Sequence, residues 1–369
     1  MSYFGINVFD FGAKGDGVTD DTAAIQSAID FAAERGGGKI LFPYTPHGYR
    51  IASPGRETYN GRVVRAQLIL PPGSANIQLE GEMPCRVLHS YQVRPLEAAL
   101  HGYSPTTFGR PSINNTCLFS DWDAPEVHDP TEHPWSILAA PEGDSCRGKF
   151  SRTLISLTNL EFRVPMDKER MYPTQSAVNL QHCSRVNIRD CHFCLDEQVG
   201  DTLLEKELQK NPCHTVGLMT SGDQNDNQVL SNVAVQGFKY GIVMGEHVVA
   251  DYLYIHNCEE GVVFHDCSHL TVINHIVAQH NAVIIATMHE ELFGHRKGPC
   301  HVEIGSVNFE PGTDLKPEVS RLRYAVYDPE NRLHGSVHWH KPWGVQEFPV
   351  CGAEDFSVSR LRSNRHIKN

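Results

Sequence analysis

Ile188-Arg189-Asp190-Cys191-His192-Phe193 and Leu230-Ser231-Asn232-Val233-Ala234-Val235 share one pattern, in which a polar residue stands between alternating apolar positions. The same pattern returns along the chain at intervals of 20 to 42 residues. Its polar position is occupied in turn by Asn159, Asp190, Asn232, Tyr252, His275 and Ser306. Alternation with a period of two indicates strands rather than helices, and repetition at such intervals is typical of a solenoid.

Each polar position after Asn159 is preceded, about one strand length earlier, by a pair of apolar residues. These pairs are Val178/Leu180, Val216/Leu218, Ile242/Met244, Val262/Phe264 and Val283/Ile285. We therefore predict three short strands per turn, each pairing with the equivalent strand of the next turn. That arrangement is an all-β fold, a single-stranded parallel β-helix. The polar side chains should stack in one column and bond to backbone groups where the strands break.

The composition limits the number of domains and the class of partner. The chain has 369 residues, and because the core of a solenoid lengthens without thickening, we expect one domain. The formal net charge of −12 and the absence of a long Lys/Arg run argue against nucleic acid and membrane as partners. The 11 cysteines show no disulfide spacing and the first residues do not read as a signal peptide, so we expect reduced thiols in a cytoplasmic protein.

One helix is predicted near the N-terminus, after the turn-rich run Gly12-Ala13-Lys14-Gly15-Asp16-Gly17. Gly36-Gly37-Gly38 ends this helix, and Lys39-Ile40-Leu41-Phe42-Pro43 resumes as a strand. The apolar stripe that the helix presents at 3.6-residue spacing comprises Ile25, Ala28, Ile29 and Ala32.

Residues 9–51 resemble the N-terminal segment of the pectate-lyase superfamily, the pectin-lyase-like proteins, in its polygalacturonase-related members. The resemblance implies that the β-helix is right-handed, that the helix caps its open end, and that the substrate is a carbohydrate. Asp16, Asp20 and Asp21 are then expected to hold turns and the cap rather than to catalyse. The catalytic motifs of polygalacturonases and pectate lyases are not found intact.

We predict that residues 1–369 form this single β-helix domain. Its parts are an N-terminal cap segment (1–51), an irregular insertion (89–150), clear turns of the coil (154–309), and C-terminal strands with a tail (310–369).

Two stretches raise the question of a metal ion. Carboxylates, imidazoles and tryptophans gather in residues 121–135, which could be a solvated loop or a site for a divalent ion or a sugar. Cys191 to Cys194 with Cys213-His214 suggests zinc, but Cys191 and Phe193 occupy inward positions of the repeat. We therefore predict no metal site and no cofactor, with a divalent ion such as calcium left as an alternative.

The resemblance also implies that carbohydrate binds along the sheet made by the first strand of each turn. Loops after consecutive first strands carry Asp223, Glu246 and Asp266, which should form an acidic column along one edge of that sheet. We predict these three as the catalytic residues, because cleavage of a glycosidic bond needs paired carboxyl groups. The predicted substrate-binding residues are His265 on the floor, Arg163 and Lys168 from the opposite loop, and Gln181, Asp196 and Glu197.

The leading hypothesis is a glycoside hydrolase that acts on an oligosaccharide. A polysaccharide lyase, or an intramolecular transglycosylase that releases difructose anhydrides, is the enzymatic alternative with the same fold. A non-catalytic, tailspike-like carbohydrate-binding β-helix is the third hypothesis, and it implies a homotrimer. In each case the partner is an oligosaccharide or a polysaccharide.

Overall fold

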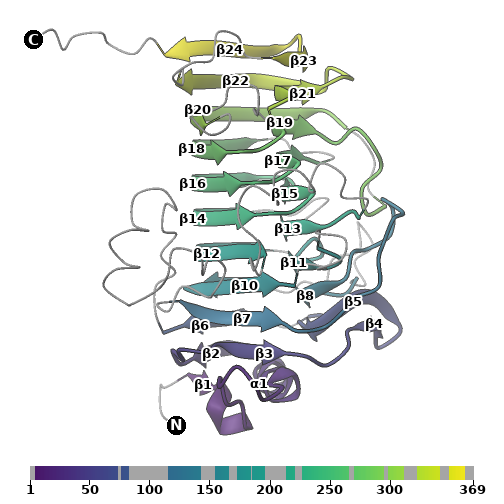
Figure 1. The fold of residues 1–369 in the computed structure, drawn as a ribbon, viewed down its shortest axis with the longest axis vertical. Coiled ribbons are helices and arrows are strands. Elements are labelled where there is room, and N and C mark those ends of the chain that lie inside the picture. The colour runs from purple at the N-terminus through teal and green to yellow at the C-terminus, as the bar shows by residue number, and fades with distance from the viewer. Residues whose placement is uncertain are drawn as a thin grey trace, which may run out of the picture.

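The computed structural model describes residues 5–73, 76–82, 115–142, 154–165, 173–183, 185–195, 213–220, 227–265, 270–294, 298–310, 322–340 and 349–361. These residues form two long sheets that run side by side along the molecule, with one α-helix at the end that contains the N-terminus (Figure 1). Within these ranges, each helix falls short of the length and apolar character that crossing a membrane requires.

The first sheet has 14 strands among the described residues. They are β1 (Ile6–Asn7), β2 (Gly38–Phe42), β3 (Tyr49–Ile51), β6 (Ile77–Gly81), β7 (Thr116–Ser120), β9 (Leu154–Thr158), β10 (Leu160–Val164), β12 (Arg185–Leu195), β14 (Gln228–Gln236), β16 (Val248–His256), β18 (Thr271–Gln279), β20 (Cys300–Glu310), β22 (Leu333–His340) and β24 (Phe356–Leu361).

The second sheet has 10 strands in the same part of the chain. They are β4 (Arg56–Tyr59), β5 (Arg62–Ile69), β8 (Ser136–Ala139), β11 (Ser176–Asn179), β13 (Val216–Met219), β15 (Tyr240–Met244), β17 (Glu260–Phe264), β19 (Val283–Thr287), β21 (Tyr324–Asp328) and β23 (Val350–Gly352). From β11 onward the chain alternates between the sheets, and equivalent strands of successive turns pair in parallel. The fold is therefore the predicted parallel β-helix.

The turns differ from the predicted three strands. β9 and β10 are separate strands on either side of Asn159, and both pair with β12. In β12 and the strands that follow it in the first sheet, the second and third predicted strands have merged into one, because the hydrogen-bonded ladder continues past the polar position. Most turns therefore contribute one short strand to the second sheet and one long strand to the first.

The predicted column of polar residues is confirmed by the register of the first sheet. Asn232 Nδ2 donates a hydrogen bond to Asp190 Oδ1 at 2.7 Å, and Tyr252, His275 and Ser306 are direct partners on neighbouring strands. Asn159, Asp190 and Asn232 have φ values of 58°, 51° and 53°. These values lie in the left-handed region, which Asn and Asp tolerate better than other residues with a side chain.

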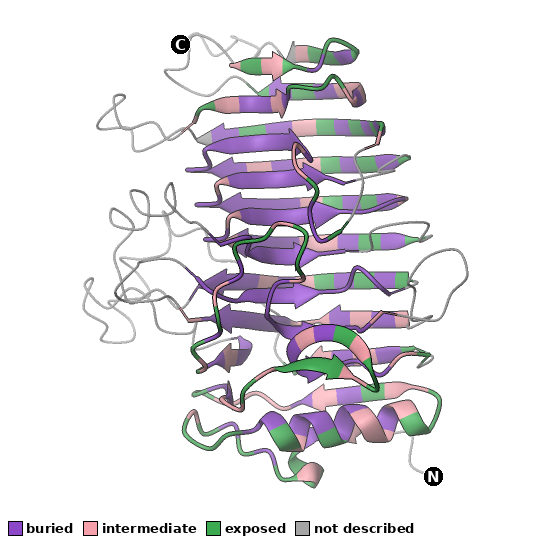
Figure 2. Cartoon of the chain, turned by 90° about the vertical axis from the view of Figure 1, so that its right-hand side faces the viewer, coloured by how far each residue is buried: buried purple, intermediate pink, exposed green. Residues whose placement is uncertain are grey.

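The N-terminal helix has the predicted capping role. α1 (Thr22–Glu34) follows a short 3-10 helix, η1 (Val8–Phe11), and lies across the end of the coil (Figure 2). The four residues of its predicted apolar stripe have no exposed surface and belong to the main core between the sheets.

The three N-terminal aspartates bind backbone groups of turns, as expected. The Asp21 carboxylate accepts hydrogen bonds from Lys14 N at 2.6 Å and Gly15 N at 3.0 Å. Asp16 accepts from the amide of Thr19, and Asp20 accepts from the amide of Thr22 at the start of α1. Their oxygens are therefore committed to the local fold.

The range predicted as an irregular insertion contributes to the coil. Residues 89–150 contain β7, which pairs with β3 and β10 in the first sheet, and β8, which pairs with β5 and β11 in the second. Composition concealed these strands because Pro, His and acidic residues dominate the sequence around them.

Candidate functional site

Two segments lie against the outer face of the second sheet: residues 121–135 and residues 288–294, which we call the crossing segments (Figure 2). They meet where Phe293 N donates to Pro130 O at 2.5 Å. The first is also bonded to the coil, through the amide of His214 and the carbonyl of Val127 at 3.3 Å.

The crossing segments cover the surface on which the sequence predicted an open carbohydrate groove. Met219, Val243 and Val263 point outward, but they are buried with Met288 and Phe293 in a second apolar cluster. Apolar burial at about 25 cal/mol per Å² favours this covered arrangement. The middle of the sheet is therefore not an exposed groove.

Few of the predicted site residues can be placed. Glu246 is 6% exposed, with one carboxylate oxygen 3.8 Å from His247 Nδ1, and His265 is fully buried. Gln181 is also buried, and its Nε2 lies 2.5 Å from His133 Nδ1. Outside the described residues lie Asp223, Asp266, Lys168, Asp196 and Glu197. The acidic column thus stays a prediction.

Arg163 does not lie in a loop across a groove from that column. It is in β10 of the first sheet, where its Nε donates to Glu161 Oε1 at 3.0 Å, and both side chains are buried. Asn115 Nδ2 donates to the other oxygen of Glu161 at 2.6 Å. Burial alone would raise the pKa of Glu161, but Arg163, His192 and Asn115 together lower it below its ordinary value.

A dense group of ionisable side chains lies instead at the N-terminal ends of strands in the second sheet. Tyr240 and Glu260 are the first residues of β15 and β17, and they are direct partners in the sheet. Lys239 directly precedes β15, and Glu290 comes from the second crossing segment. We call these four residues, together with His214, the Glu260 cluster.

Glu290 is held by three partners in this cluster. The Tyr240 hydroxyl donates a hydrogen bond to Glu290 Oε1. The same oxygen lies 3.4 Å from His214 Nδ1 and 3.9 Å from Lys239 Nζ. The side chains of Glu290 and Lys239 are 31% and 17% exposed, so a solute can reach the rim of the cluster.

Glu260 is the buried carboxyl group of the cluster. It is 6% exposed, and its Oε2 has no hydrogen-bond partner among the described residues, while Oε1 lies 3.6 Å from His289 Nε2. Burial, together with the charges of Glu259 and Glu290, raises the pKa of Glu260 to about 8, while the charges of Lys239 and Arg323 oppose the rise. At neutral pH, Glu260 therefore holds a proton beside a second carboxyl group.

The neighbouring groups are shifted by the same burial. Burial and the carboxylates of Glu260 and Glu290 raise the pKa of the Tyr240 phenol well above its ordinary value. Burial and the charge of Lys239 lower the pKa of His214. Perturbed groups concentrated at one place are typical of functional sites.

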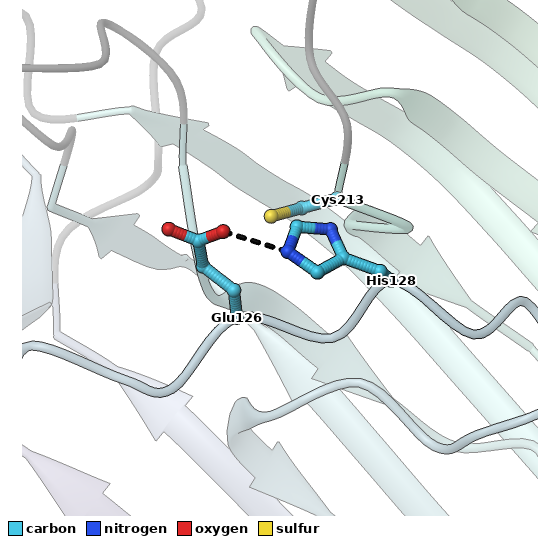
Figure 3. Close-up of side chains that lie close together, drawn as sticks. All are labelled: Glu126, His128 and Cys213. Carbon is cyan, nitrogen blue, oxygen red and sulfur yellow. Dashed lines mark ion pairs between the residues drawn. The ribbon is translucent and has the colours of Figure 1, made fainter.

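Three groups of possible metal ligands occur among the described residues, each with its ligand atoms within 4.8 Å of one another. They are Glu126–His128–Cys213 (Figure 3), His133–Glu142–His182 and Glu161–His192–Cys194. Cys191 and Phe193 face the core, as the repeat predicted, and take no part in any of them.

Comparisons with known proteins bear mainly on the N-terminal segment. The family described as rhamnogalacturonase A/epimerase, pectate lyase-like, matches residues 5–63. Alginate lyase 7 of Azotobacter vinelandii is 53% identical over 58 residues, which cover 16% of this chain and 6% of that protein. Mannuronan C5-epimerase AlgE3 of the same organism is 54% identical over 252 residues, which cover 64% of this chain and 12% of that protein. The N-terminal segment is therefore similar to that of pectate-lyase-like proteins, as the sequence predicted.

The chain spans only a small part of the length of these curated relatives. Among solved structures, pre-mature gene product 12 of bacteriophage phi29 has a TM-score of 0.47 at 14% identity, covering 97% of this chain and 41% of that one.

Sequence reasoning missed the Glu260 cluster, although a signal for Glu260 was present. In the register of the second sheet, Glu260 occupies the same outward position as Val216, Tyr240 and Val283. A carboxyl group in a column of large apolar and aromatic residues is unusual, because an ionised group loses hydration there.

The raised pKa of Glu260 predicts how stability depends on pH. The ordinary pKa of a glutamate is 4.5, and that of Glu260 in the folded protein is about 8. At a pH between these two values, Glu260 holds a proton in the folded protein and releases it in the unfolded chain. The free energy of unfolding should therefore fall as the pH rises from about 5 to 8. The charged and titratable groups that face Glu260 are Glu259, Glu290, Lys239, Arg323, Tyr240 and His289.

Comparison with Glu260→Gln isolates this contribution, because the amide binds no proton and leaves the facing groups in place. Urea unfolding at pH 5 and pH 8 should show a smaller loss of stability in the variant than in the wild type. Equal losses in both proteins would contradict the assignment of a buried, protonated Glu260.

Proposed function

We propose that this protein is a carbohydrate-active enzyme, a glycoside hydrolase in which Glu260 is the general acid and Glu290 the second catalytic carboxylate. The observation that carries the proposal is the arrangement of the two carboxyl groups: Glu260 is buried, and Glu290 lies at the partly exposed rim of the same cluster. Curated relatives that share the N-terminal segment act on carbohydrates by name, which supports the substrate class.

The chemistry follows from the separate environments of the two groups. Cleavage of a glycosidic bond requires one carboxylic acid to protonate the departing oxygen and one carboxylate to activate water or attack the anomeric carbon. Glu260 keeps its proton at neutral pH because it is buried, so it can supply that proton. Tyr240, His214 and Lys239 hold Glu290 in one orientation, which suits it to the second role.

A substrate would approach from the rim. His289 and Lys239 are partly exposed there, with side-chain exposures of 29% and 17%. Lys239 carries a positive charge, so an acidic or polyhydroxylated sugar would be favoured at this position. The Tyr240 ring beneath Lys239, with Nζ 5.3 Å from the ring centroid, closes the inner side.

Elimination from a uronate is the second candidate. A lyase needs a cation to hold the uronate carboxyl group while a base removes the neighbouring proton, and Lys239 offers such a cation. The name of alginate lyase 7, a relative over the N-terminal segment, favours this candidate.

The test is an analysis of products from purified protein incubated with neutral and uronate-containing oligosaccharides and polysaccharides. Hydrolysis should produce new reducing ends without ultraviolet absorption. An unsaturated uronate that absorbs in the ultraviolet would instead show that the enzyme is a lyase and cleaves by elimination. Products without new reducing ends would indicate intramolecular transglycosylation, and binding without any product would overturn the assignment of an enzyme.

A further inference from the structure

We propose that Glu126, His128 and Cys213 form a binding site for a thiophilic divalent cation such as Zn²⁺. The site is distinct from the proposed acid/base chemistry and does not depend on it. The three residues come from two stretches that the sequence singled out separately, the acidic and histidine-rich range 121–135 and the pair Cys213-His214.

The fold brings the three side chains to one point. Glu126 and His128 are two residues apart in the first crossing segment, and their side chains project toward one another (Figure 3). His128 Nε2 lies 2.8 Å from Glu126 Oε2. The sulfur of Cys213, which precedes β13, points into the same space (Figure 3), and the three ligand atoms lie within 4.8 Å of one another.

These spacings suit a shared ion. Zinc binds sulfur at about 2.3 Å and nitrogen or oxygen at about 2.0–2.2 Å, so ligand atoms around one zinc are roughly 3–4 Å apart. Small rotations of Glu126 and His128 away from their mutual contact would admit the ion. Three protein ligands leave a fourth position for water, as tetrahedral zinc allows.

The donor set selects the class of metal. Thiolate and imidazole favour zinc and similar ions, whereas calcium takes six to eight oxygen ligands. Cys213 is 1% exposed and lies at the inner end of the group, while the His128 side chain is 56% exposed. An ion can therefore enter past His128 and be enclosed by Cys213 and Glu126.

The other two ligand groups are weaker candidates for this class of ion. Glu161 in the third group already accepts hydrogen bonds from Arg163, whose positive charge would repel a cation. The group of His133, Glu142 and His182 has no sulfur ligand, and His133 Nδ1 contacts Gln181. Among the three groups that the described residues form, the one around Cys213 combines a thiol with an open approach.

A bound ion would fasten the first crossing segment to the coil. Only one backbone hydrogen bond of 3.3 Å, from His214 N to Val127 O, is recorded at this junction of the described residues. Because the two ligands on the crossing segment and the one before β13 meet only in the folded chain, binding should raise the thermal stability of the whole protein.

Cobalt titration of the chelator-treated, full-length protein tests the proposal. One equivalent of Co²⁺ should produce a thiolate-to-cobalt charge-transfer absorption, and one equivalent of Zn²⁺ should abolish it. Cys213→Ser should lose the band, and His128→Gln should weaken cobalt binding at least tenfold. Cys351→Ser, which changes a partly exposed thiol elsewhere, and His133→Gln, which changes the sulfur-free group, should keep both the band and the affinity.

Thermal melting separates loss of the site from loss of the fold. Zn²⁺ should raise the Tm of the wild type and of Cys351→Ser, and it should leave the Tm of His128→Gln unchanged. The proposal is overturned if the wild type shows no charge-transfer band, if Cys213→Ser keeps it, or if Zn²⁺ stabilises His128→Gln as much as the wild type.

Discussion

Glu260→Gln should lower glycan cleavage by about 10²- to 10⁴-fold, the range that a positioned general acid contributes. The amide has nearly the shape of the protonated carboxyl group, but it cannot release a proton to the departing oxygen. Burial without a hydrogen-bond partner at Oε2 indicates that the native group costs stability, so the variant should unfold at the same or a higher temperature. The measurements are kcat and kcat/KM on a substrate found in the product screen, together with Tm.

Two further glutamate variants show whether a loss of turnover is specific to Glu260. Glu80→Gln is the control, because Glu80 lies in β6, near the N-terminal end of the coil, and its carboxylate pairs with Lys39 at 2.6 Å on the surface. It should retain near-normal turnover. Glu246→Gln tests the acidic column that the sequence predicted at the other edge of the sheet. Large loss in Glu246→Gln with normal turnover in Glu260→Gln would move the catalytic acid to that edge.

The repeat was readable from the sequence because the physical constraint acts on every turn. A residue that faces the core must be apolar, and alternation then fixes the register, since a slip of one position would turn every side chain to the other face. The polar column from Asn159 to Ser306 and the inward positions of Cys191 and Phe193 were predictable for this reason. The capping role of the N-terminal helix was predictable because residues 9–51 resemble a known N-terminal segment.

The number of strands per turn was less predictable. A polar residue at a corner was expected to break the strand, as Asn159 does between β9 and β10. At Tyr252 and His275 the ladder continues, because their rings stack at 5.5 Å and the neighbouring strands stay in register. Polarity alone does not distinguish a corner from a polar position within a continuous strand.

The candidate site could not be predicted because it depends on contacts between distant parts of the chain. Glu290 reaches Tyr240 only because the second crossing segment folds back over the sheet, and no periodic pattern encodes that path. Glu126, His128 and Cys213 likewise meet across more than 80 residues of sequence. The prediction placed function on the loops after the strands, whereas the Glu260 cluster lies where the strands begin.

Arg163→Met should lower the free energy of unfolding by about 3–5 kcal/mol, which is the usual cost of removing one partner from a buried ion pair. Glu161 would then remain as a carboxylate with 1% exposure, and Asn115 and His192 carry no permanent positive charge to balance it. Urea unfolding should show a lower midpoint at an unchanged slope, since the exposed surface of the unfolded chain hardly differs.

The double variant Glu161→Gln/Arg163→Met separates the buried charge from the lost packing. Gln keeps an acceptor for the Asn115 amide and removes the charge, so the double variant should recover most of the stability lost in Arg163→Met. Lys39→Met is the surface control: Lys39 and Glu80 lie 2.6 Å apart with side chains 44% and 34% exposed, and breaking such a pair should cost less than about 1 kcal/mol. If Arg163→Met costs no more than Lys39→Met, or if the double variant is as unstable as the single one, the pair does not stabilise this part of the coil through its charges.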